Sequence, residues 1–256
     1  FISRELNQLK ADGLHIYIYS LKAPKDKIIH NEVKDLVTQT FYLPFISFKV
    51  FLINFYFMLR QPLKYFTTFI KIFLGNIKNP EFLGKTIVAW PKTVGFSWLA
   101  KKQKISHIHG QWATYPATMA FIISRLNNIP FSFTGHAHDI YVDTTMLAEK
   151  VRQAKFVVTC TAYNKNYLLG LVNGYKSQSS DHILEDKIIV NYHGVDIEKF
   201  NGSGRKPQAS SRKSFQILSV GSLLECKGFD VLIEACRLLK GEGIDFECTV
   251  AGGGPL

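Results

Sequence analysis

From residue 105 onward, the chain alternates short apolar runs with longer segments of helical periodicity. Buried parallel strands give this alternation, because each strand needs a helical crossover before the next strand can pair beside it. The pattern predicts strands at 105–109, 131–134, 156–160 and 187–190, with helices at 113–127, 144–154 and 164–173. It therefore favours an α/β fold built on a parallel sheet.

The last forty residues repeat the pattern in a shorter form. A strand from Phe215 leads to a turn between Gly221 and Gly228, then to a helix, a second strand and a second turn at 252–254. Small residues between a buried strand and a helix start expose backbone N–H groups and the positive end of the helix dipole, which together hold an anion. These two turns are therefore the predicted site for a diphosphate.

Residues 201–214 separate the two parts. They are polar and show no apolar periodicity, which is typical of a linker. We expect one domain at 1–200, a linker at 201–214 and the start of a second domain at 215–256. The chain opens on an amphipathic helix, and Pro255 suits the first turn of another helix, so we also expect both ends to continue in a longer protein.

The composition fits a folded protein in a reducing compartment. Hydrophobic residues make up 46% of the chain, which is enough for real cores. The four cysteines show no C-x-x-C spacing, so buried, reduced thiols and a cytoplasmic location are expected.

The formal net charge of +11 is unevenly placed, because residues 22–104 hold 14 Lys or Arg against 4 Asp or Glu. Within them, the segment 45–74 interleaves bulky apolar residues with lysine and arginine. Its longest uncharged run, Val50–Leu59, is shorter than the roughly 20 residues that a spanning helix needs. We predict a helix pair that lies on an anionic membrane surface, with the protein peripheral on the inner face. A core-packing pair with solvated lysines is the alternative. No nucleic-acid recognition motif accompanies the charge, so no nucleic-acid partner is expected.

Polar and titratable residues follow three of the predicted strands, at Gly110–Ala113, Gly135–Asp139 and Asn191–Asp196. Ligands of open parallel sheets bind at the carboxyl ends of the strands. These three segments are therefore the candidate site of the first domain.

Histidines in this region also allow a metal-dependent hydrolase. His107 and His109 would share one face of a strand, and His136 and His138 with Asp139 could add ligands. Such hydrolases use an eight-fold barrel, for which this chain has too few βα units. Solvation or hydrogen bonds to backbone would equally explain His107 and His109.

Four segments, in this order, resemble the successive motifs of retaining glycosyltransferases of family four, the GT-B group. They are Phe131–Tyr141, Val190–Phe200, Ile217–Asp230 and Val250–Leu256. Within that group they are similar to bacterial exopolysaccharide and colanic-acid-type transferases. The segment Phe1–Glu5 is similar to the one that follows the first strand of these enzymes.

The resemblance implies two Rossmann-like domains that face each other across a cleft, here the N-terminal acceptor domain and the first part of the nucleotide-sugar domain. It implies transfer of a sugar, with retention, from a nucleotide-sugar donor to a saccharide acceptor in surface or exopolysaccharide biosynthesis. The basic aromatic segment suggests that this acceptor is lipid-linked. No metal ion or other cofactor is implied.

Individual roles follow from the same resemblance. His136 matches the histidine near the transferred sugar, and Asp139 would orient its loop. Lys227 matches the lysine that binds the donor diphosphate. The other residues of the implied diphosphate site are Gly221, Ser222, Gly228, Gly252 and Gly253, and those of the implied cleft and hinge are His193, Gly194 and Asp196.

Two departures from the family pattern bear on activity. Ser222 stands where the family usually has an arginine, and the family's paired glutamates, spaced eight apart, would come after residue 256. Loss of one charge-assisted phosphate contact costs roughly 1.5–3 kcal/mol. We therefore expect the 256-residue chain alone to be inactive, and a non-enzymatic, degenerate GT-B protein that assists assembly at a membrane is the alternative.

Overall fold

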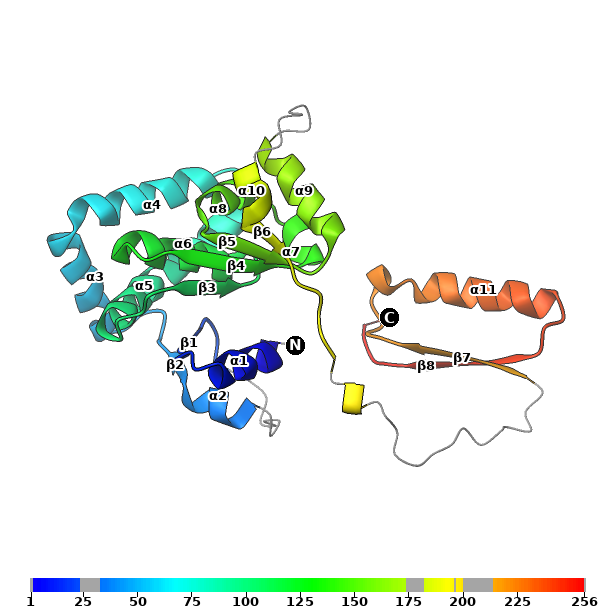
Figure 1. Cartoon of the computed structure of the whole chain (residues 1–256). Helices are drawn as coiled ribbons and strands as arrows, with labels where there is room; N and C mark the ends of the chain where they lie inside the picture. The colour runs from blue at the N-terminus through cyan, green and yellow to red at the C-terminus, as the bar shows by residue number, and fades with distance from the viewer. Residues whose placement is uncertain (1, 24–32, 174–181, 196, 200–213, 256) are drawn as a thin grey trace. The chain divides into compact units, whose positions relative to one another are not determined.

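The computed structural model describes residues 2–23, 33–173, 182–195, 197–199 and 214–255. The chain divides into two compact units, residues 1–195 and 196–256, which we describe one at a time (Figure 1). Residues 201–213 of the expected linker lie outside the described residues, so the linker stays a prediction.

The larger unit is an α/β structure with two parallel sheets. The order in the main sheet is β3-β4-β5-β6, and β1 pairs with β2 in a separate two-stranded sheet. Its strands are β1 (Ile18–Ser20), β2 (Thr40–Tyr42), β3 (Ile108–Gln111), β4 (Phe131–Gly135), β5 (Phe156–Thr159) and β6 (Ile188–Val190). Its α-helices are α1 (Ile2–Ala11), α2 (Lys34–Thr38), α3 (Phe48–Arg60), α4 (Pro62–Asn76), α5 (Pro80–Lys102), α6 (Tyr115–Asn127), α7 (Ala137–Tyr141), α8 (Leu147–Gln153), α9 (Ala162–Asn173) and α10 (His182–Lys187).

The parallel sheet predicted from the sequence is confirmed, but its first strand begins later than expected. The prediction placed this strand at 105–109, whereas β3 runs from Ile108 to Gln111. The end of α5 uses the intervening residues: Lys104 has a positive φ of 54°, and the N–H of Ile105 donates to the carbonyl of Ala100 at 3.0 Å. This is a Schellman-type helix end, which periodicity alone does not reveal.

The core of the larger unit lies between the main sheet and its helices. Phe133 on β4, Val157 on β5 and Phe121 on α6 are fully buried. Helix α6 packs on β3 and β4, and α9 packs on β5 and β6. These helices cover the face of the sheet that carries Phe133 and Val157, whereas on the other face His109 is exposed and Phe156 is half-buried.

Helices α3, α4 and α5 form a layer beside α6. Buried polar groups tie this layer together: Trp90 Nε1 donates to the Tyr65 hydroxyl at 2.9 Å, and that hydroxyl donates to Asn54 Oδ1 at 3.0 Å. Asn54 in turn donates to the carbonyl of Pro91 at 3.0 Å. Within the described residues, no helix is both long and apolar enough to span a membrane.

The smaller unit contains β7 (Phe215–Val220), the short 3-10 helix η3 (Glu225–Lys227), α11 (Phe229–Gly241) and β8 (Phe246–Ala251). Strand β7 pairs in parallel with β8, from Phe215 opposite Phe246 to Val220 opposite Ala251. The predicted strand, turn, helix and strand are confirmed. Large apolar side chains on both strands and on α11 are exposed.

Candidate functional site

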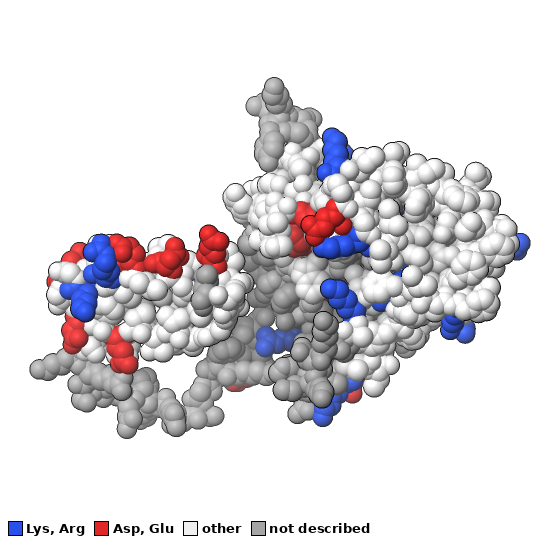
Figure 2. Space-filling model, turned by 180° about the vertical axis from the view of Figure 1, so that it is seen from behind, with Lys and Arg blue, Asp and Glu red and all other residues white. Residues whose placement is uncertain are grey.

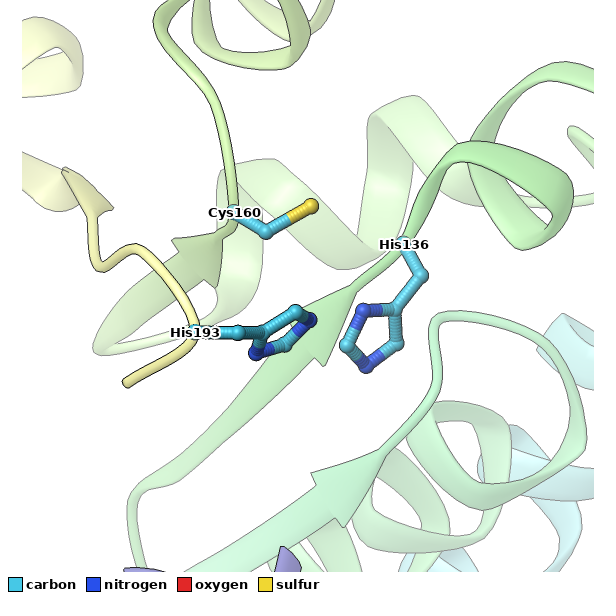
Figure 3. A group of neighbouring side chains, drawn as sticks. All are labelled: His136, Cys160 and His193. Carbon is cyan, nitrogen blue, oxygen red and sulfur yellow. The ribbon is translucent and has the colours of Figure 1, made fainter. Parts of the chain in front are cut away.

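The carboxyl edge of the main sheet gathers side chains from three neighbouring strands. His136 follows β4, Cys160 follows β5 and His193 lies three residues after β6. The ring centroids of His136 and His193 are 5.2 Å apart, and Figure 3 shows the Cys160 sulfur pointing toward the space beside these two rings. Trp112, which follows β3, brings its ring within 6.4 Å of the His136 ring. The sequence prediction of a site at this edge thus has a geometric counterpart in this unit.

Asp139 joins two of these strand ends. Its carboxylate accepts a hydrogen bond from the His136 N–H at 2.7 Å and another from the N–H of Ala113. The side chain is 4% exposed. A buried carboxylate that accepts two backbone N–H groups fixes both loops, so Asp139 holds the backbone that carries His136 in place.

Lys150 binds the other backbone polar group of Ala113. Its ammonium group donates to the carbonyl oxygen of Ala113 at 2.6 Å and contacts the hydroxyl of Thr118 at 3.3 Å. Burial lowers the pKa of Lys150 to about 7, and Asp143 and Asp139 counteract this shift only in part. This buried lysine could not be recognised from the sequence, because its position on α8 resembles an ordinary surface position of a helix.

The electrostatics of His136 favour the neutral imidazole. Burial lowers its pKa below the usual value, and His193 lowers it further, while Asp139 and Glu5 counteract the shift. At pH 7 the ring can therefore both donate and accept a hydrogen bond.

Helix α1 contributes to the same edge. Gln111 donates to Glu5 at 3.2 Å, and Arg4 donates to the carbonyl of Gly194 at 3.4 Å. The opening segment of the chain therefore lies beside the ends of β3 and β6. The sequence analysis noted that this segment is similar to a family motif, but it did not predict where the side chains of Arg4 and Glu5 lie.

The paired histidines that suggested a metal hydrolase do not form such a site. His107 and His109 both bond to the Ser132 hydroxyl at 2.7 Å, and His109 also bonds to Thr134 at 3.0 Å. Burial lowers the pKa of His109 to about 4. His138 is exposed on α7. His109 is exposed, and the side-chain partners of both histidines are hydroxyl groups of the adjacent strand rather than backbone, because parallel pairing sets His109 opposite Ser132.

Trp112, His136, Cys160 and His193 form what we call the strand-end group. Cys160 is the member of this group that the sequence analysis missed as a site residue. It was expected to be simply buried, yet it is partly exposed, and Asn164 Nδ2 donates to its sulfur at 3.5 Å. Asn164 is itself buried and accepts from the Tyr141 hydroxyl at 2.6 Å. The available signal was the position of Cys160 at the carboxyl end of a predicted strand.

In the smaller unit, the two predicted diphosphate turns lie side by side. The N–H of Gly221 donates to Ala251 at 3.1 Å, and the N–H of Leu223 donates to Gly253 at 3.0 Å. A side chain at Gly252 would collide with the carbonyl of Gly221. The close approach of two backbones therefore accounts for glycine at 252.

The first of these turns leads directly into α11. Gly228 has φ of +65° and caps the helix, and Lys227 and Ser222 are exposed next to it. The first-turn N–H groups of a helix have no intrahelical partner and favour an anion. Asp230 occupies the same first turn and adds a negative charge there.

The structure does not support a special role for two of the predicted hinge residues. Asp196 lies outside the described residues. A side chain at Gly194 would meet no atom within 4 Å, so packing does not demand glycine there. His193, by contrast, is placed directly at the strand-end group.

An open hollow of about 510 Å³ also occurs in the larger unit, between α4 and α8. An ion pair between Lys71 and Glu149, at 2.5 Å, lies on its wall. None of its lining residues belongs to the strand-end group.

No protein-family model matches the chain. The chain is 45% identical over 71 residues to the amylovoran biosynthesis glycosyltransferase AmsK of Erwinia amylovora, a match that covers 28% of this chain and 17% of AmsK. It is 40% identical over 70 residues to the putative colanic acid biosynthesis glycosyltransferase WcaL of Escherichia coli, covering 27% of this chain and 16% of WcaL. The WcaL protein of Salmonella typhimurium is 39% identical over 70 residues, with the same coverage of both chains.

The matched segment is thus a small part of each relative. The chain's α/β fold with parallel sheets agrees with the Rossmann-like GT-B architecture. Over the matched segment, the chain is a homologue of the glycosyltransferases of exopolysaccharide biosynthesis.

Proposed function

We propose that this chain forms part of a retaining glycosyltransferase that moves a sugar from a nucleotide-sugar donor to a saccharide acceptor in exopolysaccharide biosynthesis. The likeness to AmsK and WcaL is the observation that carries the proposal. The strand-end group of the larger unit and the glycine turns of the smaller unit support it. The acceptor binds mainly to the larger unit and the donor to the smaller one.

The donor diphosphate is neutralised without a metal ion in this proposal. The N-terminus of α11 and the exposed Lys227 supply the positive charge that stabilises the departing nucleotide diphosphate. Ser222 contributes a hydroxyl where the family usually has a guanidinium group. Since only one βαβ unit follows residue 213 here, the 256-residue chain by itself is expected to show no steady turnover.

His136 is the residue whose removal tests the transferase directly. We expect His136→Ala, made in the full-length protein encoded by the parent gene, to lower the transfer rate by about 100-fold or more, because an oriented hydrogen-bonding group is lost next to the reacting sugar. The measurement is transfer of radiolabelled sugar from a panel of nucleotide sugars to membrane extracts. His138→Ala is the matched control, since His138 is two residues away and exposed.

The outcome also decides between an enzyme and an assembly protein. If both variants and the unaltered protein lack transfer, while the unaltered protein restores polysaccharide production in a deletion strain, the non-enzymatic alternative is correct. The departure at Ser222 favours that alternative. Equal rates for the two histidine variants would remove His136 from the mechanism.

We also propose that α3 and α4 dock on an anionic membrane, where the acceptor is held by its lipid. The outward faces of both helices are apolar, although their inward faces already bury apolar side chains such as Val50, Phe57 and Ile72. Asn54, Thr68 and Asn76 are buried, whereas Phe48 is 77% exposed and Leu63 is 81% exposed. The other large apolar side chains exposed on the two helices are Phe51, Leu52, Phe55, Tyr56, Leu59, Phe66, Ile70, Phe73 and Leu74. A helix on a water-soluble surface keeps its outward face polar, so this second apolar face needs a partner of its own.

The charges around this face fit an anionic surface. Residues 36–80 contain no Asp or Glu, and Lys49, Arg60 and Lys78 are exposed. Lysine or arginine near an anionic bilayer contributes about 1 kcal/mol per side chain. The protein is therefore expected to act on the cytoplasmic face of the membrane as a peripheral protein, and the alternative of a purely core-packing helix pair leaves the outward apolar residues unexplained.

Liposome co-sedimentation tests the docking. We expect the 256-residue chain to bind vesicles that contain phosphatidylglycerol and to bind at least about tenfold less when Phe48 and Leu63 are both changed to Ser, since each substitution removes up to roughly 3 kcal/mol of apolar burial. Changing the exposed Phe215 and Leu218 of β7 to Ser is the matched control. Binding that is indifferent to anionic lipid, or to the two helix substitutions, would count against the proposal.

A further inference from the structure

We propose that His136, Cys160 and His193 form a binding site for Zn²⁺ at the carboxyl edge of the main sheet, and that the bound ion blocks sugar transfer. Each residue offers one ligand atom, and these atoms all lie within 4.8 Å of one another. The second half of this inference rests on the proposed function, whereas the binding itself does not.

The donor set selects the type of ion. Two imidazoles and one thiolate are ligands that zinc prefers, whereas Mg²⁺ and Ca²⁺ prefer oxygen. Three protein ligands leave a fourth tetrahedral position open for water or a substrate hydroxyl. The cluster therefore differs from the all-protein site of a structural zinc ion.

The geometry needs only a modest adjustment. Ligand atoms around a tetrahedral zinc ion are roughly 3.3–3.6 Å apart, given the usual bond lengths, so the group must contract by about 1 Å. All three side chains stand at strand ends, and Figure 3 shows them turned toward one space. His193 is exposed, so its side chain can rotate without disturbing the core.

A supporting shell is already in place around the cluster. The buried Asn164 donates to the Cys160 sulfur at 3.5 Å, and its own carbonyl is held by Tyr141. Asp139 fixes the backbone of His136. Such outer contacts orient metal ligands and keep them in place before the ion arrives.

Binding at this position has a defined consequence. An ion bound by His136 occupies the ring that the proposed transfer uses to orient the sugar. Zinc would therefore act as an inhibitor, which agrees with a transfer reaction that itself needs no metal.

Cobalt titration of the purified 256-residue chain tests the site without any donor or acceptor. We expect a thiolate-to-cobalt charge-transfer band that saturates at one ion per chain and is displaced by Zn²⁺ but not by excess Mg²⁺. Cys160→Ser should abolish the band. His193→Ala should weaken zinc binding on the order of 100-fold in competition with a chromogenic chelator, because a ligand is lost.

Two variants serve as matched controls. Cys226→Ser removes an exposed cysteine of the smaller unit, and His107→Ala removes an imidazole that bonds to Ser132. Both should leave the cobalt band unchanged, and circular dichroism checks that every variant folds. Absence of saturable binding in the unaltered chain, or a band that persists in Cys160→Ser, would overturn the proposal.

Inhibition is measured separately on the full-length protein, with each variant compared with its own rate in the absence of zinc. Zinc at saturating concentration should suppress transfer by the unaltered protein and by Cys226→Ser, but not by Cys160→Ser. Cobalt binding without any transfer activity would refute the proposed function and leave the zinc site standing. Transfer that zinc does not affect would refute the inhibitory role.

Discussion

The two units of this chain contain the same structural motif but differ in what covers it. In the larger unit, four parallel strands lie under helices, and Phe133 at the centre of β4 is fully buried. In the smaller unit, two strands and one helix pair correctly, yet none of the described residues is buried. Correct strand pairing therefore does not by itself create a core; the strands also need enough helices packed over their apolar face.

The charges of the two units also differ. Residues 1–195 hold 23 Lys or Arg against 12 Asp or Glu, whereas residues 196–256 hold eight of each. Figure 2 shows Asp and Glu side chains together with Lys and Arg on the smaller unit, while the visible face of the larger unit is mostly uncharged, with scattered Lys and Arg side chains and a group of Asp and Glu. The whole basic excess therefore belongs to the unit that carries the apolar outer face of α3 and α4.

The largest expected difference between the units is in amide hydrogen exchange. Amides of β4 and β5 should exchange on the order of 10³-fold more slowly than those of β7 and β8, because opening the covered sheet requires global unfolding of its unit. Exchange measured by mass spectrometry at the level of peptides tests this. Equal protection of both sheets would mean that the exposed apolar faces of the smaller unit are covered in solution.

The next effect concerns the buried carboxylate of the larger unit. Asp139→Asn should lower the free energy of unfolding by about 2–3 kcal/mol, because the amide can accept only one of the two backbone N–H bonds and turns a donor toward the other. Asp230→Asn, at an exposed position on α11, should change it by at most about 0.5 kcal/mol. Urea unfolding followed by circular dichroism measures both. Similar losses for the two variants would show that the Asp139 clamp is not formed.

A third prediction is a pH dependence of stability caused by Lys150. The pKa of Lys150 is about 7 in the folded chain, whereas an ordinary, solvated lysine has a pKa of 10.5. Between these two pH values the unfolded chain therefore binds more protons than the folded chain. Stability contributed through this group is therefore lost as the pH falls from about 10.5 to 7, by up to about 1.4 kcal/mol per pH unit. The free energy of unfolding of the unaltered chain should rise with pH relative to that of Lys150→Met over this range.

Lys240→Met provides the comparison for the loss of one lysine charge at an exposed position. Parallel pH profiles for the unaltered chain and Lys150→Met would indicate that Lys150 stays solvated and does not hold the Ala113 carbonyl.

Much of the fold could be predicted from the sequence, because strand and helix identity follow from local periodicity. The strands β4, β5, β7 and β8 all occur where apolar runs predicted them. The start of β3 could not be predicted, since it depends on how α5 ends. Lys104 takes a left-handed conformation that cannot be predicted from the sequence. A non-glycine residue rarely adopts this conformation, so no local rule assigns it.

The candidate site was likewise only partly predictable from the sequence. Because residues after parallel strands meet at one edge, the sequence was sufficient to nominate His136, Asp139 and His193. It was not sufficient to select Cys160 over His138, since that choice depends on which side chains turn toward the edge.

The sequence by itself determined the alternation of strands and helices, the glycine turns and the uneven charge, because these depend on residue type and spacing along the chain. Only the tertiary structure decided which polar groups became partners. Asp139 accepts from Ala113, Lys150 donates to the same residue and His109 bonds to Ser132. These contacts join residues 23 to 37 positions apart, and their distances depend on packing between elements rather than on any local preference.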